Sequence, residues 1–280
     1  MPILVVYSNQ AYEHMVLSFL ASRSYAGAED FQVVFYSVGY DSDIDFNNLI
    51  KRRWDPLVTR DNLQLYKPHI ILKSLEEFGT DMIYFDTDVL LGKRFDPSLL
   101  VSTYEYPVAC IGPMEYVNYW EKDDLGNVIW YTEQALMDYY SVAARTCPYL
   151  WTSMIGYGPR CRDFIQEWCS MVDNTYFHRD GMTRYYMPFG DETPFNVLMW
   201  RRGCTEYLPR YFVNTTFFNT IKRVEMEDAL VFKDEINPDV LLQTPSVYEK
   251  CDDSSIVQFY HGIKDTYEIL KTLGWMLHRK

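Results

Sequence analysis

Two aspartates separated by one residue, Asp86 and Asp88, are the side chains of this sequence best suited to hold a metal ion. They lie in the stretch 81–91, which reads as a short apolar run, too short for a helix, that delivers both carboxylates at its carboxyl end and predicts a strand. Side chains two residues apart on a strand point the same way, so we expect both carboxylates to face one point. A hard divalent cation takes oxygen ligands and often bridges to phosphate, so the pair predicts a metal–phosphate site.

A second acidic pair, Asp191 and Glu192, comes directly before a predicted helix, and Pro194 suits the first turn of that helix. Carboxylates at this position can cap the helix and interact with its dipole, which is a purely structural role. They can equally be site residues, and the residues alone leave both interpretations open.

Basic side chains and a histidine add to this set. Lys67 begins a predicted helix over residues 66–78, where it is either a solvated lysine or a cation near a phosphate. Near the end of the chain, a strand-like run over residues 257–260 leads to His261, to a glycine and to Lys264. The histidine lies close to a lysine at the end of a strand, so we expect it to have a functional role.

The elements that must position these residues begin with a buried strand over residues 3–8, a helix over 10–26 and a second strand over 31–38. This order predicts an α/β fold with a mostly parallel central sheet flanked by helices. Ligands of such sheets bind beyond the carboxyl ends of the strands, so Tyr7, Ser8 and Asn9 are candidate nucleotide contacts. No Gly-x-Gly-x-x-Gly follows the first strand, which leaves a dinucleotide fold unsupported.

The remaining segments show no clean boundary, so we predict a single domain over residues 1–280 with halves at about 1–100 and 101–280. Gly79 is expected to end the helix that precedes the aspartates. Residues 102–150 are irregular and rich in tyrosine and tryptophan, which predicts an insertion that receives a second substrate. A strand over 150–157 and an amphipathic helix around 164–171 follow.

Composition excludes several classes of protein. The net charge of −13 argues against nucleic acid and against anionic lipid as partners. The amino end lacks the features of a signal peptide, and no apolar run is long enough to span a membrane, so we expect a soluble, cytoplasmic protein. The six cysteines have no paired spacing and are expected to be reduced and mostly buried. An aromatic content of 17% supplies either core residues or a surface on which sugars stack.

Taken together, these motifs resemble GT-A fold glycosyltransferases and, more loosely, glycosyltransferase family 8. The resemblance lies in Tyr66-Lys67-Pro68 opening a helix, the strand with Asp86-Thr87-Asp88, Gly190-Asp191-Glu192 before a helix that contains Asn196, and His261-Gly262-Ile263-Lys264. In order, the motifs cover most of the chain. The soluble glycosyltransferases of bacterial glycan assembly and of large algal viruses are similar in lacking an anchor.

The resemblance implies a UDP-sugar donor, a Mn²⁺ or Mg²⁺ ion and a glycan acceptor. Asp86 would contact the donor's ribose or sugar and the metal, Asp88 would bind the metal, and His261 would add a nitrogen ligand that favours Mn²⁺. Lys264 would contact the diphosphate, and Lys67 would assist. A metal and a lysine stabilise the charge that develops on the leaving UDP.

The sequence departs from the family pattern at two places. Lys264 follows His261 more closely than is usual in family 8, and Glu192 stands where retaining members have glutamine. A carboxylate at that position can deprotonate an acceptor hydroxyl and support inversion, or act as a nucleophile with retention. We favour inversion, with Glu192 as the general base and Asp191 holding the donor sugar.

Three other functions remain open. A retaining family-8-like transferase would use the same residues, while a haloacid-dehalogenase-type phosphatase also has a strand that ends in Asp-x-Asp. A non-catalytic carbohydrate-binding protein would use only the aromatic surface. Glucose, galactose and xylose are all open as the donor sugar, and neither the acceptor nor the oligomeric state follows from the sequence.

Overall fold

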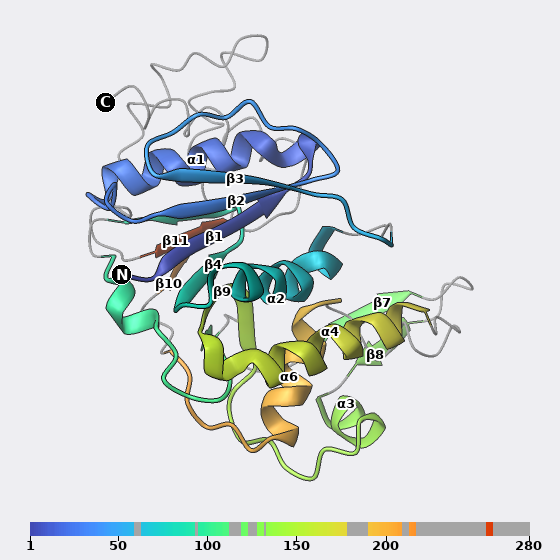
Figure 1. The fold of residues 1–280 in the computed structure, drawn as a ribbon. Coiled ribbons are helices and arrows are strands. Elements are labelled where there is room, and N and C mark those ends of the chain that lie inside the picture. Colours follow the sequence, from blue (N-terminus) through green and yellow to red (C-terminus); the bar gives the residue numbers. More distant parts are fainter. Residues whose placement is uncertain are drawn as a thin grey trace, which may run out of the picture. The chain divides into compact units, whose positions relative to one another are not determined.

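The structure is a computed structural model, and the residues that it describes are 1–58, 63–92, 95–111, 119–122, 128–131, 133–177, 190–208, 213–216 and 256–259. The fold is mixed α/β, with a six-stranded central sheet flanked by helices, as the sequence predicts (Figure 1). The strand order of this sheet is β3-β2-β1-β4-β9-β6. Its strands are β1 (Ile3–Ser8), β2 (Val33–Val38), β3 (Leu49–Trp54), β4 (Met82–Phe85), β6 (Val108–Ile111) and β9 (Leu150–Tyr157).

The described residues also form helices and two smaller sheets. The helices are η1 (Gln10–Tyr12), α1 (Glu13–Tyr25), η2 (Leu63–Tyr66), α2 (Lys67–Phe78), η3 (Pro97–Leu100), α3 (Glu133–Tyr139), η4 (Pro159–Cys161), α4 (Arg162–Phe177) and α6 (Glu192–Arg201). The remaining strands are β5 (Val89–Leu91), β7 (Tyr119–Lys122), β8 (Val128–Tyr131), β10 (Val213–Thr216) and β11 (Ile256–Phe259). Among the described residues, no helix combines the length and the apolar character needed to cross a membrane.

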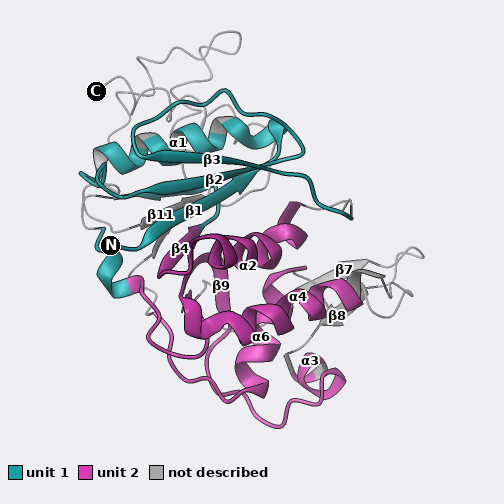
Figure 2. Cartoon of the chain, in the orientation of Figure 1, with its two compact units in different colours: residues 1–58, 85–99, 211–280 teal, residues 59–84, 100–210 magenta. Residues whose placement is uncertain are grey.

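Two compact units make up the chain, and each consists of several separate segments (Figure 2). The first unit contains residues 1–58, 85–99 and 211–280, and the second contains residues 59–84 and 100–210. The single domain expected from the sequence, with halves meeting near residue 100, stays a prediction.

In the first unit, β1 is buried along its whole length and pairs in parallel with β2, which pairs in parallel with β3. The first two strands and α1 confirm the predicted strand–helix–strand opening. Strand β3 was not predicted, because Lys51, Arg52 and Arg53 expose their side chains and hide the strand pattern. Charged residues of this kind are typical of the edge strand that β3 forms.

Helix α1 of this unit packs against β1 and β5. The rings of Phe19 and Phe85 lie 5.3 Å apart, and the backbone N–H of Leu91 donates to the hydroxyl of Ser22 at 2.9 Å. Strand β5 also pairs antiparallel with β11, which pairs in parallel with β10. The strand predicted before His261 is therefore confirmed as β11, whereas His261 and Lys264 themselves lie outside the described residues.

In the second unit, α2 forms where the sequence predicts it, with Pro68 in its first turn. Gly79 ends the helix in the left-handed region, at φ 60°, and its N–H donates to the carbonyl of Leu75 at 2.9 Å. This is the ending that glycine permits without strain. Helix α2 packs against α4, α4 against α6, and α6 against β9.

Strands β6 and β9 of this unit pair antiparallel, so the predicted aromatic insertion contains regular structure. It also holds the β7–β8 pair and α3. Within β9, Gly156 packs so closely on the carbonyl of Leu100 that a Cβ atom would lie 1.5 Å from that oxygen. Many rings fill the core, and Trp168 lies edge-on to Phe195 with centroids 5.0 Å apart. Five cysteines are free and buried, as expected: Cys110, Cys147, Cys161, Cys169 and Cys204. The sixth, Cys251, lies outside the described residues.

Candidate active site

The carboxyl end of β1 holds the three residues predicted to contact a nucleotide. Tyr7 and Ser8 are buried, and the Ser8 hydroxyl lies 3.2 Å from the hydroxyl of Tyr40. Asn9 uses its side-chain oxygen to cap η1, accepting from the N–H of Tyr12 at 3.3 Å. Burial raises the pKa of Tyr40, and the hydrogen bond between Tyr40 and Ser8 opposes this rise. Sequence reasoning missed Tyr40, although it follows β2, the parallel neighbour of β1.

The two aspartates expected on one strand lie instead in a turn, which corrects the strand argument. Strand β4 ends at Phe85, and the N–H of Val89 donates to the carbonyl of Asp86 at 3.2 Å to close the turn. The chain turns here because β4 and β5 belong to different sheets. Aspartate and threonine favour such turns. Asp86 is half-buried and Asp88 only 5% exposed.

Carboxylate oxygens are common ligands of Mg²⁺ and Mn²⁺, so the side chains of Asp86 and Asp88 are chemically suited to the expected metal. Among the described residues, no group of three or more histidine, cysteine, aspartate or glutamate side chains could hold a metal ion. The third predicted ligand, His261, and the diphosphate contact, Lys264, lie outside those residues. The metal set therefore stays a prediction.

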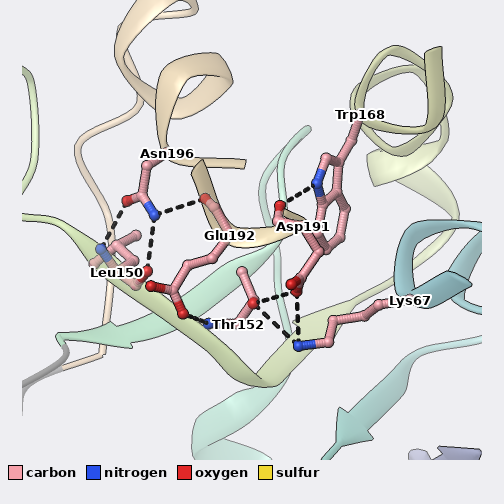
Figure 3. Close-up of polar contacts among 7 residues, drawn as sticks. All are labelled: Lys67, Leu150, Thr152, Trp168, Asp191, Glu192 and Asn196. Carbon is pink, nitrogen blue, oxygen red and sulfur yellow. Dashed lines mark hydrogen bonds and ion pairs between the residues drawn. The ribbon is translucent and has the colours of Figure 1, made fainter. Parts of the chain in front are cut away.

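In the second unit, Lys67 is buried rather than solvated, and it forms an ion pair with Asp191. The Lys67 Nζ atom lies 2.8 Å from Oδ2 of Asp191, and both side chains are at most 5% exposed. The hydroxyl of Thr152 donates to the same Oδ2 at 2.8 Å and accepts from Lys67 Nζ at 3.1 Å (Figure 3). The ammonium group also lies 5.5 Å from the centre of the Tyr84 ring. The charge of each partner is thus balanced inside the protein.

Asp191 stands at the N-cap position of α6, but its side chain makes no capping hydrogen bond. The carboxylate is used by Lys67 and Thr152, which argues against the capping alternative for this residue. Its backbone carbonyl accepts from the indole N–H of Trp168 at 2.8 Å (Figure 3). Trp168 comes from α4 and is completely buried, so it fixes the backbone where α6 begins.

Glu192 is half-buried and begins α6 beside β9. Its Oε2 accepts from the backbone N–H of Thr152 at 3.4 Å (Figure 3). Tyr149, which directly precedes β9, contacts the hydroxyl of Thr193 at 3.2 Å. Burial, followed by the negative charge of Glu192, raises the pKa of Tyr149 well above its ordinary value. Its phenol group therefore remains neutral next to Glu192.

Asn196 joins α6 to the start of β9. Its side-chain oxygen accepts from the N–H of Leu150 at 2.7 Å, and its amide donates to the Leu150 carbonyl at 2.8 Å. The same amide donates to the backbone carbonyl of Glu192 at 3.0 Å (Figure 3). These bonds fix the position of Glu192 relative to the strand.

The structure brings Lys67, Asp191 and Glu192 together in the second unit, whereas the sequence placed Lys67 near a diphosphate and not beside Asp191. The other described candidates, Tyr7, Ser8, Asn9, Asp86 and Asp88, belong to the first unit. Sequence reasoning assigned no role to Thr152, Trp168 or Tyr149. For Asn196 the sequence did give a signal. This residue follows Glu192 by four positions, which is one helical turn, so a contact between the two residues could be expected.

Comparisons of this chain with known proteins identify its fold. No protein-family model matches the sequence, and no curated protein sequence matches it. Two crystal structures of LgtC are similar in fold, each with a TM-score of 0.55 over 98% of this chain and 95% of the other. One is an active-site mutant with glutamate in place of glutamine, at 12% identity. The other is the galactosyltransferase in complex with donor and acceptor sugar analogs, at 11% identity. The fold that this chain shares with LgtC is the GT-A fold.

Proposed function

We propose that this protein is a metal-dependent glycosyltransferase that moves a sugar from a UDP-sugar to a hydroxyl group of a glycan acceptor. The observation that carries the proposal is the acidic pair at the start of α6, held in place within a GT-A fold. Asp191 is buried and ion-paired, whereas Glu192 is half-buried and so accessible to a substrate. A similar structure was solved with donor and acceptor sugar analogs bound, which supports the same classes of ligand here.

In this proposal, the two acids have different roles. Among the described residues, the ion pair and the hydrogen bond of the Asp191 carboxylate both involve Oδ2, so Oδ1 can accept a hydroxyl of the donor sugar. Glu192 accepts the proton of the acceptor hydroxyl as the acceptor oxygen bonds to the anomeric carbon. The bond from that carbon to UDP breaks, and UDP leaves with the electron pair. Attack opposite the leaving group inverts the anomeric centre.

The donor's nucleotide and diphosphate are assigned to the remaining predicted residues. Tyr7, Ser8 and Asn9 contact the nucleotide, Asp86 and Asp88 hold the metal with His261, and Lys264 contacts the diphosphate. When bound, Mn²⁺ or Mg²⁺ stabilises the negative charge on the leaving UDP. Because Lys67 is already paired with Asp191, we assign it to that acid and leave the diphosphate to Lys264.

Thermal unfolding with UDP, with and without Mn²⁺, tests the proposal directly. A rise in Tm that requires both ligands is expected. Screening UDP-glucose, UDP-galactose and UDP-xylose for hydrolysis then identifies the donor. Glu192→Gln should abolish transfer and leave UDP binding nearly unchanged, and the anomeric proton in the product NMR spectrum reports the stereochemistry. A protein that responds to neither UDP nor Mn²⁺ and hydrolyses none of the sugars would contradict the proposal.

A further inference from the structure

Thr152 is the residue of β9 that contacts both acids of the candidate site. Its hydroxyl lies 2.8 Å from Oδ2 of Asp191, and its backbone nitrogen lies 3.4 Å from Oε2 of Glu192 (Figure 3). The residue is 1% exposed, so water does not compete for its hydroxyl. One residue on a strand therefore contacts the side chains of two neighbouring residues at the start of a helix.

The hydroxyl group of Thr152 has a single possible orientation. An ammonium group only donates, so the 3.1 Å contact with Lys67 uses a lone pair of the Thr152 oxygen. The single hydroxyl proton is then given to Asp191, which as a carboxylate only accepts. With the 2.8 Å ion pair, the three groups form a closed triangle in which each contact restricts the other two.

The backbone of Thr152 is restrained as well. Strand β9 pairs with β6 at Leu150 and Trp151, immediately before Thr152. Asn196 holds both backbone groups of Leu150, and it also binds the carbonyl of Glu192. The N–H that faces Glu192 is thus fixed by the sheet on one side and by α6 on the other.

We propose that Thr152 is a positioning residue, which orients Asp191 through its hydroxyl and Glu192 through its backbone N–H, so that the two acids act on one substrate in a fixed relation. This inference rests on the proposed function, in which Asp191 holds the donor sugar and Glu192 takes the acceptor proton. Small displacements of such groups reduce rates strongly, because the reacting atoms must be closely aligned.

Two substitutions separate the hydroxyl from the shape of the side chain. Thr152→Val keeps the shape and the backbone N–H but removes the hydroxyl, and we expect it to lower kcat by about 10- to 100-fold. The KM for the UDP-sugar should change by less than about 3-fold, because the nucleotide contacts are unaffected. Thr152→Ser restores the hydroxyl and should recover most of kcat. A Thr152→Val enzyme with the kcat of the wild type, or a serine variant as impaired as the valine variant, would overturn the proposal.

Thr146→Val is the matched control, since the Thr146 hydroxyl donates to the carbonyl of Cys204 at 2.7 Å and contacts neither acid. The variant loses one hydrogen bond of a half-buried threonine, so its Tm should fall while its kcat stays near that of the wild type. If Thr146→Val lowers kcat as much as Thr152→Val, the loss reflects general stability and the positioning role is wrong.

A double-mutant cycle in urea tests the contact without any activity. Thr152→Val should raise the unfolding equilibrium constant about 10-fold in the wild type, and less than about 2-fold in an Asp191→Ala background. Asp191→Asn replaces the alanine variant if the latter does not fold. Additive effects would overturn the contact itself. Coupled effects in a protein that transfers no sugar would instead overturn the proposed function, and the catalytic part of this inference with it.

Discussion

The ammonium group of Lys67 lies 2.8 Å from the carboxylate of Asp191, and both side chains are almost completely removed from water. The pair joins the first turn of α2 to the position before α6, two segments far apart in the sequence. Buried charges persist where each partner compensates the desolvation of the other and further hydrogen bonds assist. Here the Thr152 hydroxyl provides that hydrogen bonding. We therefore expect these residues of the candidate site to stabilise the fold of the second unit as well.

Removal of Lys67 tests this dual role. Lys67→Met leaves the Asp191 charge buried without its counterion, and we expect the free energy of unfolding to fall by about 3–5 kcal/mol. The double variant Lys67→Met/Asp191→Leu removes both charges and should recover much of this loss. Urea unfolding followed by circular dichroism measures the three variants. Arg162→Met is the control, because its 3.3 Å pair with Glu76 is exposed and should contribute little.

Alkaline pH should destabilise the protein through Tyr149. Burial raises the pKa of this phenol well above its ordinary value of about 10, so the folded chain keeps a proton that the unfolded chain loses. The stabilising contribution is therefore complete below pH 10 and falls above it, by up to about 1.4 kcal/mol per pH unit for one group. Urea titrations between pH 8 and 11 measure the slope. Tyr149→Phe should reduce the slope, and an unchanged slope would contradict the assignment to Tyr149.

Gly156 should tolerate no larger residue. Any Cβ atom at this position meets the backbone carbonyl of Leu100 at 1.5 Å, and a backbone group cannot turn aside as a flexible side chain can. Gly156→Ala is therefore expected to destabilise the protein by about 3 kcal/mol or more, or to prevent folding. Gly203→Ala serves for comparison: its Cβ has open space, although its φ of 68° adds some backbone strain. Thermal unfolding of the two variants should show a clearly larger fall in Tm for Gly156→Ala.

Asp88 is expected to control the response to metal. Asp88→Asn removes a charged oxygen ligand, so the rise in Tm caused by Mn²⁺ in the presence of UDP should be largely lost. Asp96→Asn is a matched control in the same unit, because Asp96 is exposed and its carboxylate binds Ser98. Differential scanning fluorimetry at several Mn²⁺ concentrations gives the comparison. Equal rises in Tm for the two variants would contradict the assignment of Asp88 as a metal ligand.

Local patterns were sufficient to predict much of the fold. Strand β1 and helices α2 and α6 were predicted from runs of apolar residues and from the glycine and proline at their ends. Strand β3 escaped prediction because its charged edge has no apolar alternation. The turn at Asp86 and Asp88 also escaped, because a strand pattern does not show that β4 and β5 enter different sheets.

Sequence reasoning selected the two acids of the candidate site but not the residues that contact them. Asp191 and Glu192 stand out because an acidic pair precedes a helix. The buried ammonium group of Lys67 donates to the hydroxyl of Thr152, and nothing near either residue in the sequence indicates this contact. The roles of Trp168 and Tyr149 depend in the same way on how α4 and β9 pack beside α6, which is decided by tertiary structure.

The division of the chain into two interleaved units limits how the protein can be cut. The chain passes between the units after residues 58, 84, 99 and 210, so no single contiguous fragment contains a whole unit and nothing else. Simple truncation therefore cannot isolate either half for separate expression. A polypeptide containing one unit alone would need its segments rejoined by new linkers, and exchange of the second unit with that of a homologue would require several junctions rather than one.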